Sequence, residues 1–395
     1  MRMFRNRALS TLAVASAVLL LASGCAATAP AKPHAATTSA PTPTLDSSTA
    51  AALQKALDGT RTQAGSPGAI AEVTSPAGTW IGSSGTAAQG TDTPVTPDDR
   101  TRIGSLTKTM TATILLQLVE EHKLSLDDTI GKYVPGMPNG DTATLRQLAD
   151  MTSGIPSYTA STAWQNAVFA DPQKQWTPQS LVDFEKGQPA DFAPGAGWAY
   201  SNTNYVLLGM VIEKVTGEPI ATVFNKRIFE PLKMTHSSFP VGTNTIASPY
   251  LSGITEQGQP DGKTADATEF SPSIAFTAGQ VISTLSDLEK WSDALFTGHG
   301  ILTPAMQKLR RDSIIRNIPP NTAQAGYGLG IGDRNGWWGH DGEIPGYNTV
   351  LFHNYALDTT IIVIVNSDVP FGPADAQQSP AQAVFAALVK VLSKP

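Results

Sequence analysis

Apolar residues recur every three or four positions over several stretches of the chain, the spacing of a helix that buries one face. The first predicted helix starts at Asp46, Ser47 or Ser48, each able to cap its N-terminus, and carries Leu53 and Leu57 on one face. The other predicted helices cover residues 107–121, 145–151, 178–185, 204–215, 283–296 and 380–392.

Apolar and β-branched runs between turn residues predict strands at both ends of the folded part. They cover residues 68–74, 79–85, 327–331, 349–353 and 359–366, and residues 361–365 are apolar throughout, as in a central strand. The simplest architecture that accommodates these helices and strands is α+β. One antiparallel sheet is flanked by the N- and C-terminal helices as an α/β sandwich, and a mostly helical subdomain is inserted. We expect the sheet part at about 46–121 and 271–395, and the helical part at about 122–270.

The beginning of the chain has the pattern of an export signal. Arg2, Arg5 and Arg7 precede an apolar run over residues 8–21 that ends in small residues. A positive segment followed by such a run indicates a secretory signal, here over residues 1–24.

The single cysteine, Cys25, directly follows this signal. The segment L-A-S-G-C at 21–25 resembles a bacterial lipobox, whose cysteine becomes the lipidated N-terminus, although Ala22 stands where leucine is more usual. The alternative is an ordinary secreted protein with a stray cysteine. Residues 25–45 are rich in Ala, Thr and Pro and predict a tether before a domain at 46–395. We therefore expect an exported protein, lipid-anchored to the outer face of the bacterial cytoplasmic membrane.

The composition is that of a globular chain with many turns. The 395 residues are 41% hydrophobic and 15% charged, with 34 Gly and 29 Pro. The formal net charge is −6, and loss of residues 1–24 removes three of 27 basic and none of 33 acidic residues, which leaves −9. Such an acidic chain without a Lys/Arg cluster argues against nucleic acid as a partner. We expect a monomer.

Three short segments carry candidate chemistry: S-L-T-K at 105–108, Y-S-N at 200–202 and H-D-G at 340–342. Ser105 and Lys108 are three residues apart and therefore share one face of a helix. An amine there can accept the serine proton and activate a nucleophile. A helix-start serine is otherwise most often a cap, and a tyrosine or histidine taken alone is more often part of the core.

In this order and with their flanks, the segments resemble the Ser-x-x-Lys, Tyr-x-Asn and Lys/His-x-Gly signatures of the penicillin-binding-protein superfamily. The flanks T-L-R-Q-L at 144–148, T-S-G-I-P at 152–156 and E-P-L at 230–232 resemble its class C β-lactamase and D-alanyl-D-alanine carboxypeptidase branch. The resemblance runs from about residue 50 to 390. It implies a β-lactamase/transpeptidase-like fold and an acyl-enzyme mechanism.

The candidate catalytic residues are Ser105 as nucleophile with Lys108 and Tyr200. Burial of Lys108 should lower the pKa of its amine, and a phenol at Tyr200 beside two cations should titrate lower, so either could be the base. The resemblance implies an oxyanion hole made by the backbone N–H groups of Ser105 and Glu343. The implied substrate-binding residues are Asn202, His340, Gly342 and Glu343.

The third segment departs from the lysine found in many family members. His340 is mostly neutral at pH 7 and can still hydrogen-bond Tyr200. Asp341 would repel a substrate carboxylate if it faced the cleft, but alternation along a strand can also point it away. We therefore predict weak β-lactamase activity at best.

The sequence favours a serine hydrolase of the cell envelope, most like a D-alanyl-D-alanine carboxypeptidase or β-lactamase-related enzyme acting on a peptidoglycan peptide or a small molecule. The alternatives are an esterase of small esters on the same fold and a non-catalytic penicillin-binding-like protein. G-x-S-x-G, H-E-x-x-H and a cysteine pair are absent, and G-Y-G-L-G at 326–330 does not complete a dinucleotide fingerprint. We expect neither a metal nor a cofactor.

Overall fold

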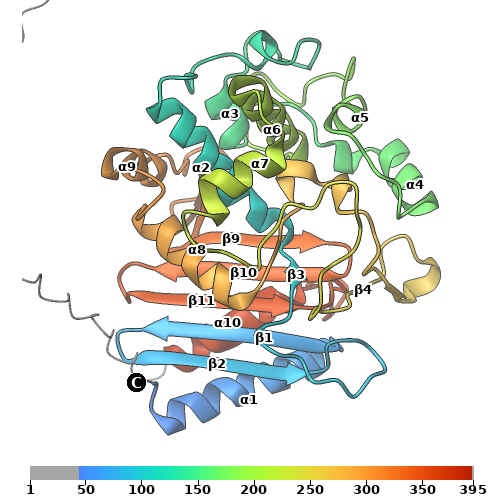
Figure 1. Ribbon diagram of the computed structural model, residues 1–395, viewed down its shortest axis with the longest axis vertical. Coiled ribbons are helices and arrows are strands. Elements are labelled where there is room, and N and C mark those ends of the chain that lie inside the picture. The colour runs from blue at the N-terminus through green and yellow to red at the C-terminus, as the bar shows by residue number, and fades with distance from the viewer. Residues whose placement is uncertain (1–43, 394–395) are drawn as a thin grey trace, which may run out of the picture. The chain divides into compact units, whose positions relative to one another are not determined.

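The computed structural model of the protein describes residues 44–393 and is built around one seven-stranded antiparallel sheet (Figure 1). Its strands, in spatial order, are β2 (Gly78–Gly85), β1 (Gly68–Ser75), β11 (Thr359–Val365), β10 (Tyr347–Asn354), β9 (Trp337–Ile344), β8 (Gly332–Arg334) and β7 (Ala325–Tyr327). The N- and C-terminal parts of the chain therefore meet in the middle of the sheet, where β1 pairs with β11.

The two terminal helices, α1 (Ser47–Gln63) and α10 (Pro380–Leu392), cover one face of the sheet. Asp46 caps α1 by accepting hydrogen bonds from Ser48 N and Thr49 N. This layer is held by apolar side chains of both helices and of β1, β10 and β11, including Leu53, Leu57, Val350, Val363, Val384 and Leu388.

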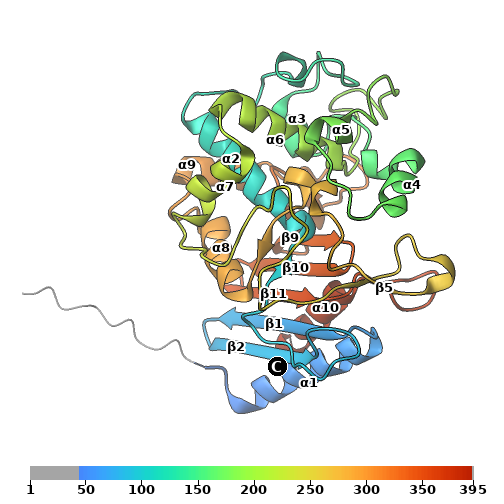
Figure 2. The ribbon, with the colours of Figure 1, turned by 45° about the vertical axis from the view of Figure 1, so that its right-hand side comes forward.

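The other face of the sheet carries the remaining helices. They are α2 (Thr107–Glu120), α3 (Leu145–Ala149), α4 (Thr162–Ala170), α5 (Pro178–Val182), α6 (Asn202–Thr216), α7 (Ile220–Phe224), α8 (Leu285–Thr297) and α9 (Pro304–Asp312). Helices α3 to α6 lie beyond β9, on the side away from β1 and β2 (Figures 1 and 2). Two short strand pairs accompany them: β3 (Thr101–Arg102) with β6 (Ile282–Ser283), and β4 (Ile254–Thr255) with β5 (Ala265–Asp266).

Residues 361–365 of β11 are all apolar because both faces of the sheet are covered there. Val363 and Val365 pack on the side of α1 and α10, whereas Ile362 and Ile364 pack into the core of the helical side. The predicted fold class, an antiparallel sheet with terminal helices and a helical insertion, is confirmed.

Some predicted elements differ from the observed ones. The expected strand over 327–331 ends at Tyr327, because Gly330 turns the chain with φ +71°. Strand β9 did not stand out in the sequence, since Gly339 and Gly342 interrupt its apolar pattern. The folded part begins slightly before Asp46, because Leu45 is already buried in the core.

The predicted signal, Cys25 and the predicted tether up to residue 43 lie outside the described residues. In the described part of the chain, no helix combines the length and the apolar character required to span a membrane.

One buried carboxyl group lies on β1, three strands away from β9, which carries the third motif. Glu72 on β1 is 2% exposed; its Oε1 accepts a hydrogen bond from Thr74 Oγ1 at 2.9 Å, and its Oε2 has no partner among the described residues. Burial, with repulsion from Glu289, raises the pKa of Glu72 to about 7. The ionised form is therefore disfavoured in the folded state.

We expect Glu72→Gln to stabilise the protein at pH 8 but hardly at pH 5. The folded-state pKa lies above the unfolded one, so the native state bears an increasing cost of ionisation as the pH rises from about 4.5 through 7. The gain in free energy of unfolding at pH 8 should be on the order of 2 kcal/mol. Chemical denaturation at both pH values measures it, and Glu289→Gln should give a smaller gain at pH 8 because it removes only the repulsion. Equal gains at pH 5 and pH 8 would contradict the assignment.

Candidate active site

Ser105 lies where the chain enters helix α2. The short 3-10 turn Gly104–Leu106 leads from β3 into α2, and Ser105 is partly exposed at its centre. Gly104 has φ +52° and lies against β9, so a Cβ there would be 2.6 Å from Glu343 N. Glycine is required for both the backbone angle and the close approach. This contact presses the Ser105 turn against the strand that carries the third motif.

Lys108 in the first turn of α2 is completely buried and surrounded by acceptors. Its Nζ lies 2.9 Å from Ser105 Oγ, 2.8 Å from Asn202 Oδ1 and 2.7 Å from the carbonyl oxygen of Ala278. Carbonyl oxygens accept only, so a neutral amine can donate its two N–H groups to Asn202 and Ala278. Its lone pair is then free to face the Ser105 hydroxyl.

The protonation of Lys108 follows from its burial. Every residue of α2 from 107 to 116 is buried, and no ion pair joins Lys108 to a carboxylate in residues 44–393. Desolvation lowers the pKa of the Lys108 amine well below 10.5, and the more distant charge of Asp341 opposes this only in part.

Asn202 begins α6 and is fixed through three of its polar groups. Its Oδ1 accepts from Lys108, its Nδ2 donates to Thr159 Oγ1 at 3.1 Å, and its backbone N donates to Ser157 Oγ at 3.0 Å. The amide is therefore oriented with its oxygen towards the lysine. One N–H of Nδ2 remains available for a substrate carbonyl.

Tyr200 lies beside the same amine. Lys108 Nζ is 4.9 Å from the centre of the Tyr200 ring, and 38% of the residue is exposed. Burial of the hydroxyl raises the pKa of Tyr200 well above 10, although a hydrogen bond with Ser105 acts in the opposite direction. The expectation that this phenol titrates lower is wrong, because desolvation disfavours the phenolate and the two expected cations, Lys108 and His340, are themselves held neutral.

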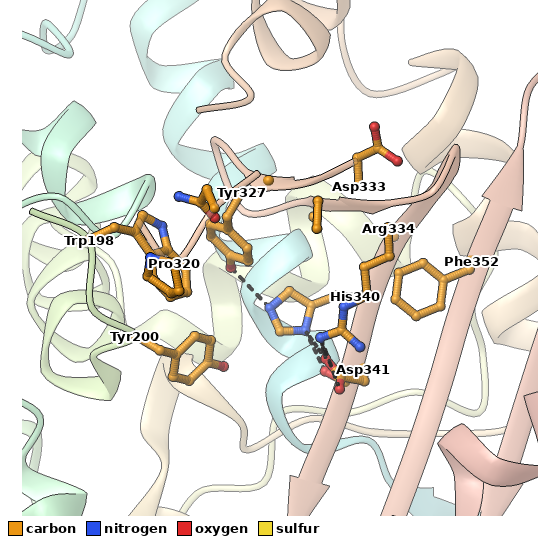
Figure 3. Close-up of a pocket in the computed structure, with 14 residues that line it drawn as sticks. Trp198, Tyr200, Pro320, Tyr327, Asp333, Arg334, His340, Asp341 and Phe352 are labelled. Carbon is orange, nitrogen blue, oxygen red and sulfur yellow. Dashed lines mark hydrogen bonds and ion pairs between the residues drawn. The ribbon is translucent and has the colours of Figure 1, made fainter. Parts of the chain in front are cut away.

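His340 on β9 is 4% exposed and makes two polar contacts. Its Nε2 lies 3.0 Å from Tyr327 Oη, and its Nδ1 contacts the backbone carbonyl of Asp341. Burial lowers the pKa of His340 to about 4. Both ring nitrogens are thus occupied, so the expected hydrogen bond to Tyr200 is not formed. The two rings instead lie side by side, tilted by 52°, with centres 6.2 Å apart (Figure 3).

Asp341 points to the face of the sheet that α10 covers. It pairs in register with Val350 of the α1–α10 layer and accepts a hydrogen bond from Gln382 of α10. Arg334 Nη2 lies 3.5 Å from both carboxylate oxygens (Figure 3). Asp341 therefore points away from the cleft, as the alternation of side chains along a strand allows.

The backbone groups of the expected oxyanion hole lie close together. A Cβ on Gly342 would be 1.9 Å from the carbonyl oxygen of Ile103, so β9 passes the Ser105 turn in tight contact. The amide of Ser105 is in the first turn of its helix, where N–H groups have no partner within the helix. The Ser105 and Glu343 backbones can therefore present two N–H groups to one substrate oxygen.

Two hollows flank these residues. The Ser105 pocket, with about 730 Å³ of open space, is lined by polar groups and by Tyr158, Trp164, Phe169, Ile274 and Ile344, but no Lys, Arg or His is among its described lining residues. The His340 pocket, with about 550 Å³, lies on the side of Tyr200 and His340 and is lined also by Trp198, Tyr327, Arg334 and Asp341 (Figure 3). Residues 44–393 contain no group of three or more His, Cys, Asp or Glu placed to hold a metal ion.

Four residues that make hydrogen bonds in this site were not predicted from the sequence: Ser157, Thr159, Ala278 and Tyr327. Ala278 acts through its carbonyl and leaves no sequence signal. Ser157 and Thr159 directly follow the quoted flank at 152–156, which could have drawn attention to them. Tyr327 begins the predicted strand over 327–331 and lies inside G-Y-G-L-G, and neither pattern indicates its hydrogen bond to His340.

Similar proteins were found in sequence and in structure. A "Putative penicillin-binding protein PbpX" of Bacillus subtilis is 29% identical over 266 residues, which are 67% of this chain and 61% of that protein. A D-stereospecific amidohydrolase from Streptomyces sp. is 34% identical, with a TM-score of 0.75, over 85% of this chain and 97% of that one. A D-amino acid amidase from Ochrobactrum anthropi SV3 is 30% identical, with a TM-score of 0.74, over 88% and 98%.

The chain spans about 60% of the length of the curated relatives that it matches. The family model described as Beta-lactamase matches residues 51–384, which include all three motifs. The chain therefore belongs to the beta-lactamase family of serine hydrolases.

Proposed function

We propose that this protein is a serine amidohydrolase that forms an acyl-enzyme on Ser105 and acts on amides of D-configured amino acids or short peptides. The observation that carries the proposal is the arrangement at Lys108, where two carbonyl acceptors leave the amine lone pair towards Ser105 Oγ. Within the family, the quoted flanks favour the class C and carboxypeptidase branch.

In the proposed reaction, Lys108 Nζ takes the proton from Ser105 as Oγ forms a bond to the substrate carbonyl carbon. The N–H groups of Ser105 and Glu343 stabilise the oxyanion; each such donor is typically worth about 2.7–4 kcal/mol. The proton passes from Lys108 through the Tyr200 hydroxyl to the leaving amine as the C–N bond breaks. Water then attacks the ester and releases the acid and Ser105.

Lys108, rather than Tyr200, is the base in this proposal. Desolvation lowers the pKa of the amine and raises that of the phenol. The resting site therefore favours a neutral amine that can accept a proton and a neutral phenol that can only relay one.

The lining of the Ser105 pocket supports a substrate that is uncharged or bears an amine over one that bears a carboxylate. None of its described lining residues is a cation, and Arg334 in the His340 pocket is already paired with Asp341. A β-lactam or a peptide ending in D-alanine brings a carboxylate that needs a positive partner. The similar D-stereospecific amidohydrolase and D-amino acid amidase, each 30% identical or more, support D-amides as the substrate class.

The other functions considered are a D-alanyl-D-alanine carboxypeptidase, an esterase of small esters and a non-catalytic penicillin-binding-like protein. An esterase would use the same Ser105 chemistry on an easier leaving group. The non-catalytic alternative is disfavoured because Ser105, Lys108, Tyr200 and Asn202 are all present.

A substrate panel tests the proposed function. We expect D-phenylalanine amide to be hydrolysed faster than its L-isomer, a D-alanyl-D-alanine peptide or a chromogenic cephalosporin. Ser105→Ala should lose at least about 10³-fold in kcat. Intact mass after incubation with a fluorophosphonate should show one adduct, absent in Ser105→Ala. Efficient cephalosporin turnover, with kcat/KM near 10⁶ M⁻¹s⁻¹, or an adduct that persists in Ser105→Ala, would contradict the proposal.

The base assignment predicts a particular pH dependence. Because Lys108 must be neutral to accept a proton, kcat/KM should rise with pH through the lowered pKa of the amine and level off above it. Lys108→Arg should lose about 10²–10⁴-fold at every pH, since a guanidinium does not release its proton. Tyr200→Phe should be slower but keep the same rising limb. Loss of that limb in Tyr200→Phe, with wild-type folding, would identify the tyrosine as the base.

We also propose that the protein is exported and anchored by a lipid on Cys25, as the basic-then-apolar start and the Ala/Thr/Pro-rich segment indicate. In a bacterial host, wild type should incorporate labelled palmitate and sediment with membranes. Cys25→Ser should incorporate none and appear in the soluble exported fraction, with unchanged Ser105 reactivity. Equal membrane association of both forms would refute the anchor.

A further inference from the structure

The hydrogen bonds of His340 determine which of its nitrogens carries the proton. The Asp341 carbonyl can only accept, so His340 Nδ1 must be the donor in that contact. In the neutral ring, Nε2 then presents a lone pair, and the partner that it faces is the Tyr327 hydroxyl at 3.0 Å. Tyr327 Oη–H is therefore placed to donate to His340 Nε2.

The charged groups around His340 favour this neutral form. Arg334 of β8, and Lys108 of α2 whenever it carries a proton, oppose a positive charge on the ring, whereas Asp341 next to it favours one. The other titratable neighbours are the phenols of Tyr200 and Tyr327, whose burial raises their pKa values well above 10. They are hydrogen-bonding groups rather than counter-ions. Burial of the ring is the largest contribution against the charged form.

The Gly-rich segment around Tyr327 is shaped to hold this hydroxyl in place. A Cβ on Gly328 would lie 2.3 Å from Ser313 Oγ, and one on Gly330 would lie 2.4 Å from Ala112 Cβ of α2. Gly330 also has φ +71°. The segment can therefore turn directly against α2, the helix that carries Lys108. A side chain in place of either glycine would force the segment away from its neighbours.

Aromatic contacts restrict the Tyr327 ring itself. It is 8% exposed and meets Trp198 at 5.9 Å, His340 at 5.6 Å and Tyr200 at 6.4 Å between ring centres, all edge to face (Figure 3). The ring is thus held in place, and its hydroxyl has two neighbouring acceptors, His340 Nε2 and the oxygen of Tyr205, whose own proton goes to the Ala149 carbonyl. Of these two, only His340 Nε2 has no proton to donate to another partner.

We propose that Tyr327 is a positioning residue that holds His340 as the neutral, Nδ1-protonated imidazole, so that His340 faces Tyr200 only through its ring and takes no proton during the reaction. This deepens the proposed function and rests on it for the effect on rate. Proton transfer is then confined to Lys108 and Tyr200. In this proposal, the G-Y-G-L-G segment positions the side chain of His340 and does not bind a nucleotide.

The tautomer can be measured without any substrate. In protein labelled with 15N-histidine, with His340→Gln to assign the signals, we expect His340 to show a protonated Nδ1 and an unprotonated Nε2 from pH 5.5 to pH 8. A His340 that is protonated on Nε2, or that titrates near 6.5, would overturn the proposal. This readout stands even if amides of D-amino acids prove not to be substrates.

Tyr327→Phe tests the role of the hydroxyl. Loss of the donor should move the His340 titration upward into the measured range and allow exchange between tautomers. It should lower kcat/KM by about tenfold, the equivalent of one buried hydrogen bond, with the larger loss at acid pH. The matched control is Tyr355→Phe, which removes a tyrosine hydroxyl that donates to the Phe296 carbonyl at 2.9 Å. Wild-type His340 signals and pH profile in folded Tyr327→Phe would refute the role of Tyr327.

Discussion

The site depends on a buried amine that has no carboxylate partner. A lysine within a helix buried on every side would ordinarily be a severe cost, and the chain offsets it with two neutral acceptors, the Asn202 amide and the Ala278 carbonyl. An ion pair in the same place would hold the amine protonated. Because both partners are neutral, Lys108 is suited to accept a proton. The same two hydrogen bonds require α6 and the segment 276–278 to lie against the start of α2.

A second constraint is steric and comes from β9. This strand crosses the start of α2 so closely that Gly104 and Gly342 exclude any Cβ at the crossing. Thr349 of β10 adds a hydrogen bond of 2.9 Å to the Ile103 carbonyl. The sheet thus holds the Ser105 turn against the backbone of Glu343. The helical side contributes Asn202 and Tyr200.

Much of this arrangement could be predicted from the sequence because its signals are local. Apolar periodicity located α2, α8 and α10, and the apolar run at 361–365 located the central strand. The residues that act through backbone or distant contacts could not be found in this way. The Ala278 carbonyl, the pairing of His340 with Tyr327 and the upward shift of the Tyr200 pKa all depend on which segments pack together. β9 was not predicted because its glycines have low strand propensity. They are present because β9 passes close to neighbouring backbone.

The order of the strands has a consequence for the synthesis of the protein. Gly68 N donates to Asn366 Oδ1 across 298 residues, and β1 pairs with β11, so the sheet closes only when almost the whole chain is available. Ser105 and Lys108 are made early, but the strand that completes their surroundings is made late. A growing or truncated chain that lacks β9 holds a serine and a lysine without an oxyanion partner. The residues of the candidate site therefore come together only when the chain is nearly complete.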